Sequence, residues 1–244
     1  MPQLLFTIHR EIETLKLSPR LQTIIEMVPP INCLADIGSD HAYVPIYLVQ
    51  QQKIQRAIAS EVSIGPRNIS QKDIAAAHLQ KQITTRLADG LTGLTANDRV
   101  DLAVIAGMGG QLIAQILEQG QQQLEYIPQL ILEPNNDEAC VRSWLNNHNW
   151  SIVQENIVQE GRHIYEIIHA QKLATPITLT EQQIMFGPQL LQKRDPIFIH
   201  KWQEQLRRAE FMANNLQNAR QPQPQKIVAA KLRIKQIKEV LNYA

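Results

Sequence analysis

The sequence predicts an α/β protein with a mostly parallel, seven-stranded sheet, followed by a C-terminal pair of helices. Two observations predict the sheet: five β-like apolar runs alternate with helical stretches up to residue 147, and two further β-like runs follow directly. A third, the helical spacing of apolar residues after residue 196, predicts the helices. Strand–helix alternation is typical of βαβ units, whose right-handed crossovers place helices on both faces of a sheet.

Each strand is predicted from a short apolar run. The five runs that alternate with helices cover residues 32–37, 56–61, 84–87, 102–106 and 129–133. The helical stretches between and after them start at residue 44 or cover residues 66–79, 111–118 and 138–147. The last two runs, 150–159 and 163–169, are separated by a segment centred on Gly161, which predicts a β-hairpin and an antiparallel end to the sheet.

The C-terminal part has a different pattern, and we divide the chain into domains 1–171 and 172–244. Asp195 followed by Pro196 is typical of a helix start, with an N-cap and a proline in the first turn. Prolines 222 and 224 end that helix. Apolar residues then recur at alternating spacings of three and four, as in a coiled-coil seam: Ile227, Ala230, Ile234, Ile237 and Leu241. An antiparallel helical hairpin is therefore expected.

The composition excludes several classes of protein. Of 244 residues, 44% are hydrophobic and 19% charged, which is typical of globular proteins rather than disordered or fibrous ones. No apolar run approaches the roughly 20 residues that span a bilayer. The first 20 residues mix charged with apolar side chains and hold no signal-peptide core, which predicts a cytoplasmic protein. Cys33 and Cys140 are expected to be reduced, buried thiols and cannot supply a zinc site alone.

Charge is distributed unevenly along the chain. Residues 1–171 carry 12 Lys and Arg against 18 Asp and Glu, whereas residues 172–244 carry 12 against 5. A basic tail on an acidic domain suggests an acidic partner, with nucleic acid the first candidate. A solvated helical surface explains the same charges equally well.

The strongest functional signal is the segment after the first predicted strand, where Asp36 precedes Gly38. Ligands of open α/β sheets bind at the carboxyl ends of the strands, and Gly38 lets the backbone approach one closely. The three-glycine dinucleotide fingerprint and a phosphate-binding loop are both absent. An acid before a single glycine favours a cationic ligand without phosphate, such as S-adenosylmethionine.

Two further acids support this interpretation. Glu61 ends the second predicted strand, where an acid binds ribose hydroxyls in nucleoside-binding sheets. Asp89, followed by Gly90, comes after the third strand and is placed to accept from an adenine amino group. A single acid at such a position is more often a helix cap, but three at successive strand ends indicate a binding site.

The fourth and fifth strands also end in unusual turns. Gly107, Gly109 and Gly110 fall within four positions, which favours close backbone approach to a ligand or a tight strand–helix turn. Glu133 and Asn135 flank a proline at the next strand end, beside that turn or as part of a plain Pro-Asn turn.

At this point the sequence resembles the TrmK family of bacterial tRNA (adenine(22)-N(1))-methyltransferases. The resemblance covers the chain from about residue 17 to the C-terminus. Its most specific carriers are residues 36–43, Asp-Ile-Gly-Ser-Asp-His-Ala-Tyr, and residues 105–110, Ile-Ala-Gly-Met-Gly-Gly. Weaker carriers in the expected order are Ser18-x-Arg20-Leu21, Glu61 with Gly65-Pro66, Asp89-Gly90-Leu91, Pro134-Asn135, Tyr165-Glu166-Ile167 and Phe186-Gly187-Pro188.

The resemblance implies a class I, Rossmann-like methyltransferase with a C-terminal coiled-coil hairpin, S-adenosylmethionine as cofactor and tRNA as partner. No metal is expected, because no His, Asp or Cys cluster has the spacing of metal ligands. Candidate catalytic residues are Asp40, Tyr43 and Asn135. Candidate cofactor-binding residues are Arg20, Asp36, Gly38, Ser39, His41, Glu61, Val62, Asp89, Gly90, Gly107, Met108 and Gly109. Glu133 departs from the Gln expected before Pro-Asn in relatives, which changes the local charge if it faces the site.

Adenine N1 carries an in-plane lone pair and no proton, so we expect positioning rather than nucleophile activation to dominate. Asp40 is expected either to accept from the adenine amino group and balance the cationic product or to cap the next helix. Tyr43 either stacks on a flipped base or packs in the fold. His41 either contacts a ligand or stabilises the turn. The resemblance implies that Arg20 contacts the cofactor carboxylate, and the alternative is a surface ion pair.

Three other functions stay open on the sequence: a small-molecule methyltransferase, a non-catalytic RNA-binding adaptor, and a coiled coil that docks a protein. A small-molecule methyltransferase would not need the basic tail, and a non-catalytic adaptor would not need intact acids at the cofactor site. The predicted coiled-coil seam spans only about two heptads, which is short for a protein-docking coiled coil. Amino-group and cytosine-C5 methylases are disfavoured. The turn after the fourth strand lacks an Asn/Asp-Pro-Pro-aromatic sequence, and both cysteines fall inside predicted elements.

Overall fold

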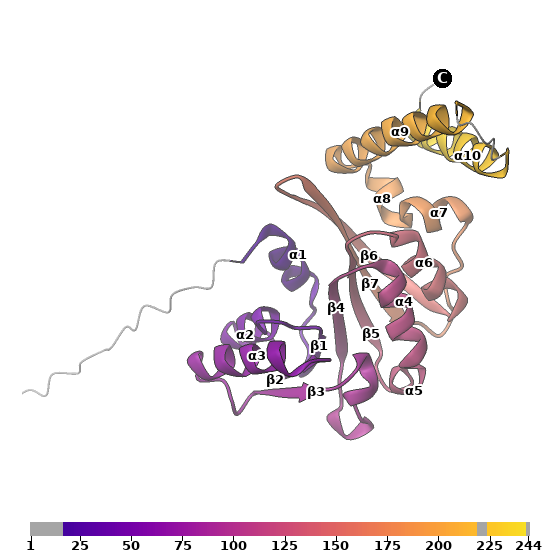
Figure 1. Cartoon of the computed structure of the whole chain (residues 1–244). Helices are drawn as coiled ribbons and strands as arrows, with labels where there is room; N and C mark the ends of the chain where they lie inside the picture. The colour runs from indigo at the N-terminus through magenta and orange to yellow at the C-terminus, as the bar shows by residue number, and fades with distance from the viewer. Residues whose placement is uncertain (1–16, 219–223, 243–244) are drawn as a thin grey trace, which may run out of the picture.

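The computed structural model describes residues 17–218 and 224–242, and it contains one seven-stranded sheet in the order β3-β2-β1-β4-β5-β7-β6 (Figure 1). The first five strands are parallel, and β7 runs antiparallel to both β5 and β6. The predicted fold class is therefore confirmed. The strands are β1 (Cys33–Ile37), β2 (Arg56–Glu61), β3 (Ile83–Leu87), β4 (Leu102–Met108), β5 (Gln129–Pro134), β6 (Trp150–Glu160) and β7 (His163–Lys172).

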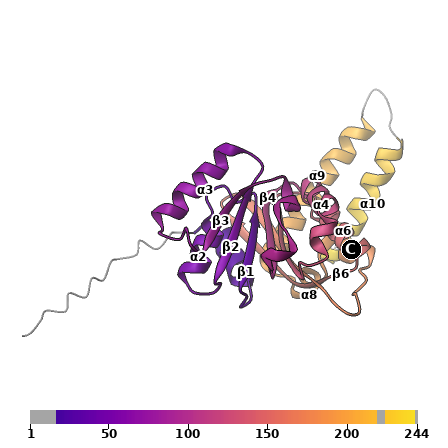
Figure 2. The same cartoon turned by 90° about the horizontal axis from the view of Figure 1, so that it is seen from below.

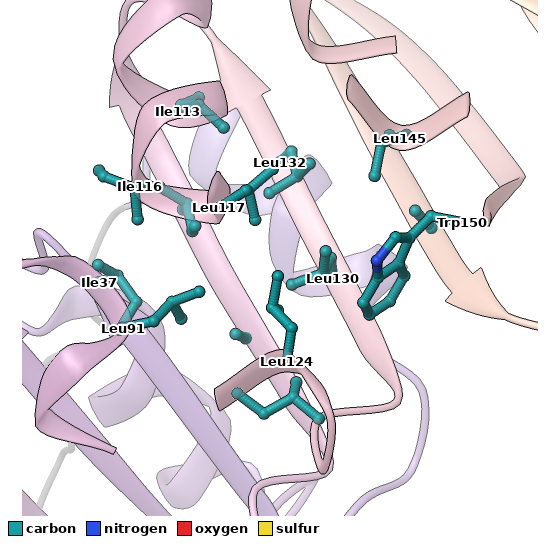
Figure 3. Close-up of a cluster of buried hydrophobic side chains, with 14 of the residues drawn as sticks. Ile37, Leu91, Ile113, Ile116, Leu117, Leu124, Leu130, Leu132, Leu145 and Trp150 are labelled. Carbon is teal, nitrogen blue, oxygen red and sulfur yellow. The ribbon is translucent and has the colours of Figure 1, made fainter. Parts of the chain in front are cut away.

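Helices cover both faces of the sheet, which explains why the central strands are apolar on both faces. In Figures 1 and 2, α1, α2 and α3 lie on one side and α4 and α6 on the other. Side chains of β1 and β4 alternate between two buried cores, one under each layer, and Figure 3 shows the α4–α6 core. The helices are α1 (Pro19–Met27), α2 (Tyr43–Gln50), α3 (Ile64–Ala76), α4 (Gly110–Gln119), α5 (Gln121–Leu124) and α6 (Glu138–Asn147), with 3-10 turns η1 (Gly90–Gly93) and η2 (Ala96–Asp98).

Most predicted boundaries agree with the structure to within a few residues. The largest shift is in α3, which begins at Ile64 rather than at Pro66 and ends at Ala76 rather than at Leu79. Helix α1 was not predicted, although Ser18 caps it and Pro19 occupies its first turn. The expectation for Cys140 was wrong in part: Cys33 is buried, but Cys140 is only partly buried, because it lies in the first turns of α6 beside an exposed loop.

The C-terminal segment forms α7 (Glu181–Phe186), α8 (Pro188–Lys193), α9 (Pro196–Gln217) and α10 (Pro224–Leu241). Helices α9 and α10 lie side by side as a projecting hairpin (Figures 1 and 2). They share a small core that includes Phe198, Trp202, Leu206 and Ile237. The predicted cap is confirmed, since the Asp195 carboxylate accepts from the backbone N–H of Ile197 at 2.8 Å.

Two predictions fall on residues outside those described: the character of residues 1–16 and the proline-rich turn at 221–223. Within the described ranges, no helix is both long enough and apolar enough to cross a membrane.

Candidate active site

The candidate site lies where the strand order reverses, between β1 and β4. Such a switch point opens a crevice at the carboxyl ends of the strands. Gly38 follows β1 with a φ of +74°, and its N–H donates to the Ser60 carbonyl at 2.8 Å. A Cβ added there would lie 2.1 Å from the Met108 methyl carbon. The turns after β1 and β4 are therefore in close contact, and Gly38 cannot be replaced without moving Met108.

Acidic side chains lie at the carboxyl ends of three neighbouring strands, β1, β2 and β3. Asp36 is buried and accepts from the Ser39 hydroxyl at 2.5 Å. Glu61, also buried, accepts from the backbone N–H of Asp40. Asp89 lies exposed at the next strand end.

Helix capping does not account for these acids. The N-cap of α2 is Ala42 and that of α3 is Ser63, so neither Asp40 nor Glu61 occupies a cap position. Asp89 is the N-cap of η1, but its side chain makes no capping hydrogen bond. Asp40 extends from the turn with its side chain two-thirds exposed. Asp40 and Asp89 are therefore exposed without a capping role, whereas Asp36 and Glu61 are buried and accept hydrogen bonds within the turn.

Burial gives the site unusual proton affinities. It raises the pKa of Asp36 to about 6, and the nearby Glu61 charge adds to that rise while the Ser39 hydroxyl opposes it. Burial also raises the pKa of Glu61 and that of Glu133, the latter against the opposing effect of Arg20. A cation bound beside Asp36 would favour its ionised form and lower its pKa again.

The segment after Gly38 is held against α3. The His41 Nδ1 lies 2.7 Å from an Asp73 carboxylate oxygen, and the Ser70 hydroxyl donates to the Asp40 carbonyl at 2.5 Å. The His41 ring also stacks on Tyr43, with centroids 4.8 Å apart. These contacts fix a backbone in which Asp40 and Ala42 both have positive φ. His41 thus links the turn to α3 and stacks on Tyr43.

A buried ion pair supports the adjacent turn after β4. Glu133 accepts from the Arg20 guanidinium at 2.7 Å and from the Gly107 N–H at 2.8 Å. Tyr165 lies under the same guanidinium, 5.4 Å from its centre. The other carboxylate oxygen of Glu133 has no partner among the described residues. Of the two readings of Arg20, the ion pair is the contact that the structure contains, and it is partly buried rather than on the surface.

Asn135 is exposed beside this turn, and its N–H donates to the Met108 carbonyl at 2.7 Å. A close backbone contact explains why the third glycine of the motif is at position 110. Its N–H donates to the Asn136 carbonyl at 3.0 Å, and a Cβ there would lie 2.4 Å from the Asp137 carbonyl oxygen. The β4–α4 and β5–α6 turns are therefore packed backbone to backbone.

The structure thus gathers the predicted residues at the carboxyl ends of β1, β2, β4 and β5. Val62 is 69% exposed after β2, and Asp89 and Gly90 follow β3. Sequence reasoning missed the residues that hold the site from elsewhere, namely Ser70 and Asp73 on α3 and Ser60 on β2. None of these carries a local signal, because each acts through a contact with a residue distant in the chain.

Comparison with known proteins identifies the family. The sequence model of TrmK, described as tRNA (adenine(22)-N(1))-methyltransferase, matches residues 34–239. The enzyme of that name from Bacillus subtilis is 34% identical over 236 residues, which are 94% of this chain and 98% of the relative. The chain belongs to the TrmK family.

Solved structures of TrmK-family proteins superpose on nearly the whole chain. The putative tRNA (m1A22) methyltransferase of Streptococcus pneumoniae in complex with S-adenosyl-L-methionine is 38% identical, with a TM-score of 0.84 covering 93% of this chain and 100% of that one. The Bacillus subtilis TrmK crystal structure is 32% identical, with a TM-score of 0.86 covering 93% and 99%. This TrmK-family member is an S-adenosylmethionine-dependent tRNA (adenine-N1)-methyltransferase, as the resemblance implied.

A groove of about 670 Å³ extends from the Asn135 turn of this TrmK-family chain to the helical hairpin. The β6–β7 turn, α9 and α10 form its other walls. Trp202 also lines it, with a buried indole N–H that has no partner among the described residues. The basic side chains that line it are Arg162, His163, His200, Lys201, Arg208 and Arg233, and the acidic ones are Asp137, Glu138 and Glu204.

Within residues 17–218 and 224–242, no cluster of three or more His, Cys, Asp and Glu side chains is arranged to hold a metal ion.

Proposed function

We propose that this chain methylates N1 of adenine 22 in tRNA, with the target base held by Asp40, Tyr43 and Asn135. The observation that supports the proposal best is the position of these residues at the carboxyl ends of β1, β2, β4 and β5, where Gly38 contacts Met108. Asp36 and Glu61 are buried there, and Asp40 and Asn135 are exposed.

The residues present fit S-adenosylmethionine. Asp36 and Glu61 supply carboxylates for its cationic and ribose groups, and Gly38, Ser39, Gly107, Met108 and Gly109 provide close backbone approach. Val62, Ile64 and Leu87 are large, exposed apolar side chains around the end of β2, where an adenine ring would cover them. His41, Asp89, Gly90 and Arg20 complete the proposed cofactor site. When bound, the cofactor supplies an electrophilic methyl group on its sulfonium.

The residues of the chain then position the base and balance its charge. N1 needs no base to remove a proton, so orientation of its lone pair is the main requirement. Asp40 accepts from the 6-amino group and offsets the positive charge that N1 methylation creates. Asn135 supplies an amide at the base edge, and Tyr43 supplies a ring on which the base can stack. Asp40 and Asn135 come from turns held rigidly by Ser70 and Met108, which favours precise placement.

The C-terminal segment, residues 172–244, is proposed to hold the rest of the tRNA as a coiled-coil hairpin. The groove leads to Asn135, so an RNA strand lying in it would place its phosphates near Arg162 and Arg208 and its target base near the site. Extraction of the base costs a few kcal/mol, which these phosphate contacts would offset. A tRNA substrate also implies a cytoplasmic protein.

The test is single-turnover methylation of an unmodified tRNA transcript by the variants N135A and D40N. Each should slow methyl transfer by about 100-fold, because a base misplaced by about 1 Å loses that much rate. Calorimetric Kd values for the cofactor should stay within twofold of wild type. The matched control is N147A, which changes an exposed Asn at the far end of α6 and should leave the rate unchanged.

Wild-type rates in both site variants would remove these residues from the reaction. If the wild-type protein binds the cofactor but labels no tRNA, the tRNA assignment is wrong and small-molecule acceptors become the substrates to test.

A further inference from the structure

A chain of buried charges joins the helical hairpin to the active-site turn. Lys201 of α9 is 9% exposed, and its ammonium group donates to carboxylate oxygens of Glu138 and, at 2.7 Å, of Glu166. Glu166 of β7 also accepts from Arg142 of α6 at 2.5 Å. Arg142 in turn donates to Glu155 of β6 at 2.8 Å. One lysine of the C-terminal segment is thus inserted between two elements of the catalytic domain.

Glu138 is the member of this network that lies closest to the chemistry. It is the first residue of α6 and directly follows the turn 135–137, which carries Asn135. Asp137 has a φ of +52°, and its side chain makes no capping hydrogen bond. The start of α6 is therefore anchored from outside the helix, by Lys201.

The other side of the turn is already fixed. The Asn135 N–H donates to Met108, and the Asn136 carbonyl accepts from Gly110. These bonds tie the turn to β4 and α4. Toward α6, the Asp137 carbonyl accepts from the Cys140 N–H at 2.9 Å, and the Glu138 carboxylate adds a side-chain anchor through Lys201. Together, the two sets of contacts hold Asn135 between the catalytic domain and the hairpin.

We propose that Lys201 is a positioning residue for methyl transfer: by holding Glu138, it seats the start of α6 and with it the Asn135 turn. The inference rests on the proposed role of Asn135 in holding the target base. It goes further in assigning the C-terminal segment a part in the geometry of the reaction, in addition to any contact with RNA. A buried ion pair with a purely structural role would affect stability instead.

The primary test is E138Q, which removes the charge at the turn but keeps the Lys201–Glu166 pair. The matched control is E118Q. Glu118 accepts from the Trp144 indole at 2.8 Å and so supports the other end of α6 through a carboxylate. E138Q should lower the single-turnover rate about 10-fold, a part of the roughly 100-fold that a 1 Å misplacement costs, with the tRNA Kd within twofold of wild type. E118Q should keep the wild-type rate.

Lys201 is tested by K201M and by the charge-conserving K201R. K201M should lower the rate at least as much as E138Q, and K201R should recover most of it. The double variant K201M/E138Q should be no slower than K201M, because both substitutions break the same Lys201–Glu138 ion pair. Additive losses would overturn the proposal.

Amide hydrogen exchange provides a readout independent of activity. The Cys140 N–H donates to the Asp137 carbonyl at 2.9 Å and the Gly110 N–H to Asn136, so both amides report on the turn. Both amides should exchange faster in E138Q than in wild type, and their exchange rates in E118Q should equal those of wild type.

Three results would overturn the proposal: unchanged rate and exchange in E138Q, an equal rate loss in E118Q, or a loss confined to tRNA affinity. Failure of the proposed function would look different, because wild-type protein would then form no N1-methyladenosine. In that case, the difference in amide exchange between E138Q and E118Q still tests whether the Lys201–Glu138 pair holds the turn.

Discussion

Within the proposed cofactor site, Asp36 is the residue whose environment departs most from that of a free side chain. Its pKa of about 6 in the folded protein lies above the ordinary value of 3.8. The folded state therefore binds this proton more tightly than the unfolded state. The stability it contributes is complete below pH about 4 and is lost as pH rises through about 6. An ionised, buried Asp36 thus opposes folding of the cofactor-free protein at neutral pH.

The variant D36N should remove this cost. At pH 8 it should unfold with a free energy larger than that of wild type by up to about 3 kcal/mol, and the difference should vanish near pH 4. Urea unfolding of the cofactor-free proteins at a series of pH values measures the effect. Parallel stability curves for the two proteins would contradict the burial of a titrating Asp36.

Cofactor binding should have the opposite dependence. A cationic ligand favours the ionised carboxylate, so wild-type affinity for S-adenosylmethionine should increase as pH rises through about 6. Glu61, whose pKa is also raised, acts in the same direction. D36N should bind weakly, with a shallower pH dependence by calorimetry, and an unchanged profile in D36N would remove Asp36 from the cofactor site.

At the scale of the elements, the site depends on turns that lie backbone to backbone. A methyl group at Gly110 would meet the Asp137 carbonyl at 2.4 Å, and this neighbour cannot rotate away as a side chain can. G110A should therefore cost about 1–3 kcal/mol of unfolding free energy, as overpacking does. Chemical denaturation measures the loss.

Gly65 offers a control of the same kind. It lies in the first turn of α3, and a Cβ there meets nothing within 4 Å. G65A should be neutral or stabilising by up to about 1 kcal/mol through helix propensity. Equal losses in both variants would show that packing at Gly110 is not the cause.

The elements were predictable because each has a local cause. Buried parallel strands appear as continuous apolar runs, and Asp36 and Glu61 lie at the carboxyl ends of two of those runs, so both the strands and these acids could be predicted from the sequence. Asp195 and Pro196 marked the start of α9 in the same way.

The partners of the site residues were not predictable. His41 pairs with Asp73, and Arg20 pairs with Glu133 across 113 positions of the chain. Such pairings follow from the packing of distant elements. Helix α1 was missed for a related reason, since its nine residues are too few for a stable isolated helix and need the sheet beneath them.

At the scale of the whole molecule, the groove between the sheet and the hairpin should bind RNA through phosphates. The variants R162A and R208A should each weaken tRNA binding and reduce the slope of log affinity against log salt by about one. Arg207 is the matched control, because it is exposed next to Arg208 but pairs with Glu204 and does not line the groove. If R207A reduced the slope of log affinity against log salt equally, tRNA would be bound by the overall positive charge of the helices rather than by the groove.

The most direct test of the central claim is to map the methylated nucleotide. The purified protein would be incubated with isotopically labelled S-adenosylmethionine and an unmodified tRNA transcript, followed by nuclease digestion and mass spectrometry. We expect labelled N1-methyladenosine at position 22 and no label when that adenine is replaced by guanine. Label at another position or on another atom of the base, or no label with intact cofactor binding, would contradict it.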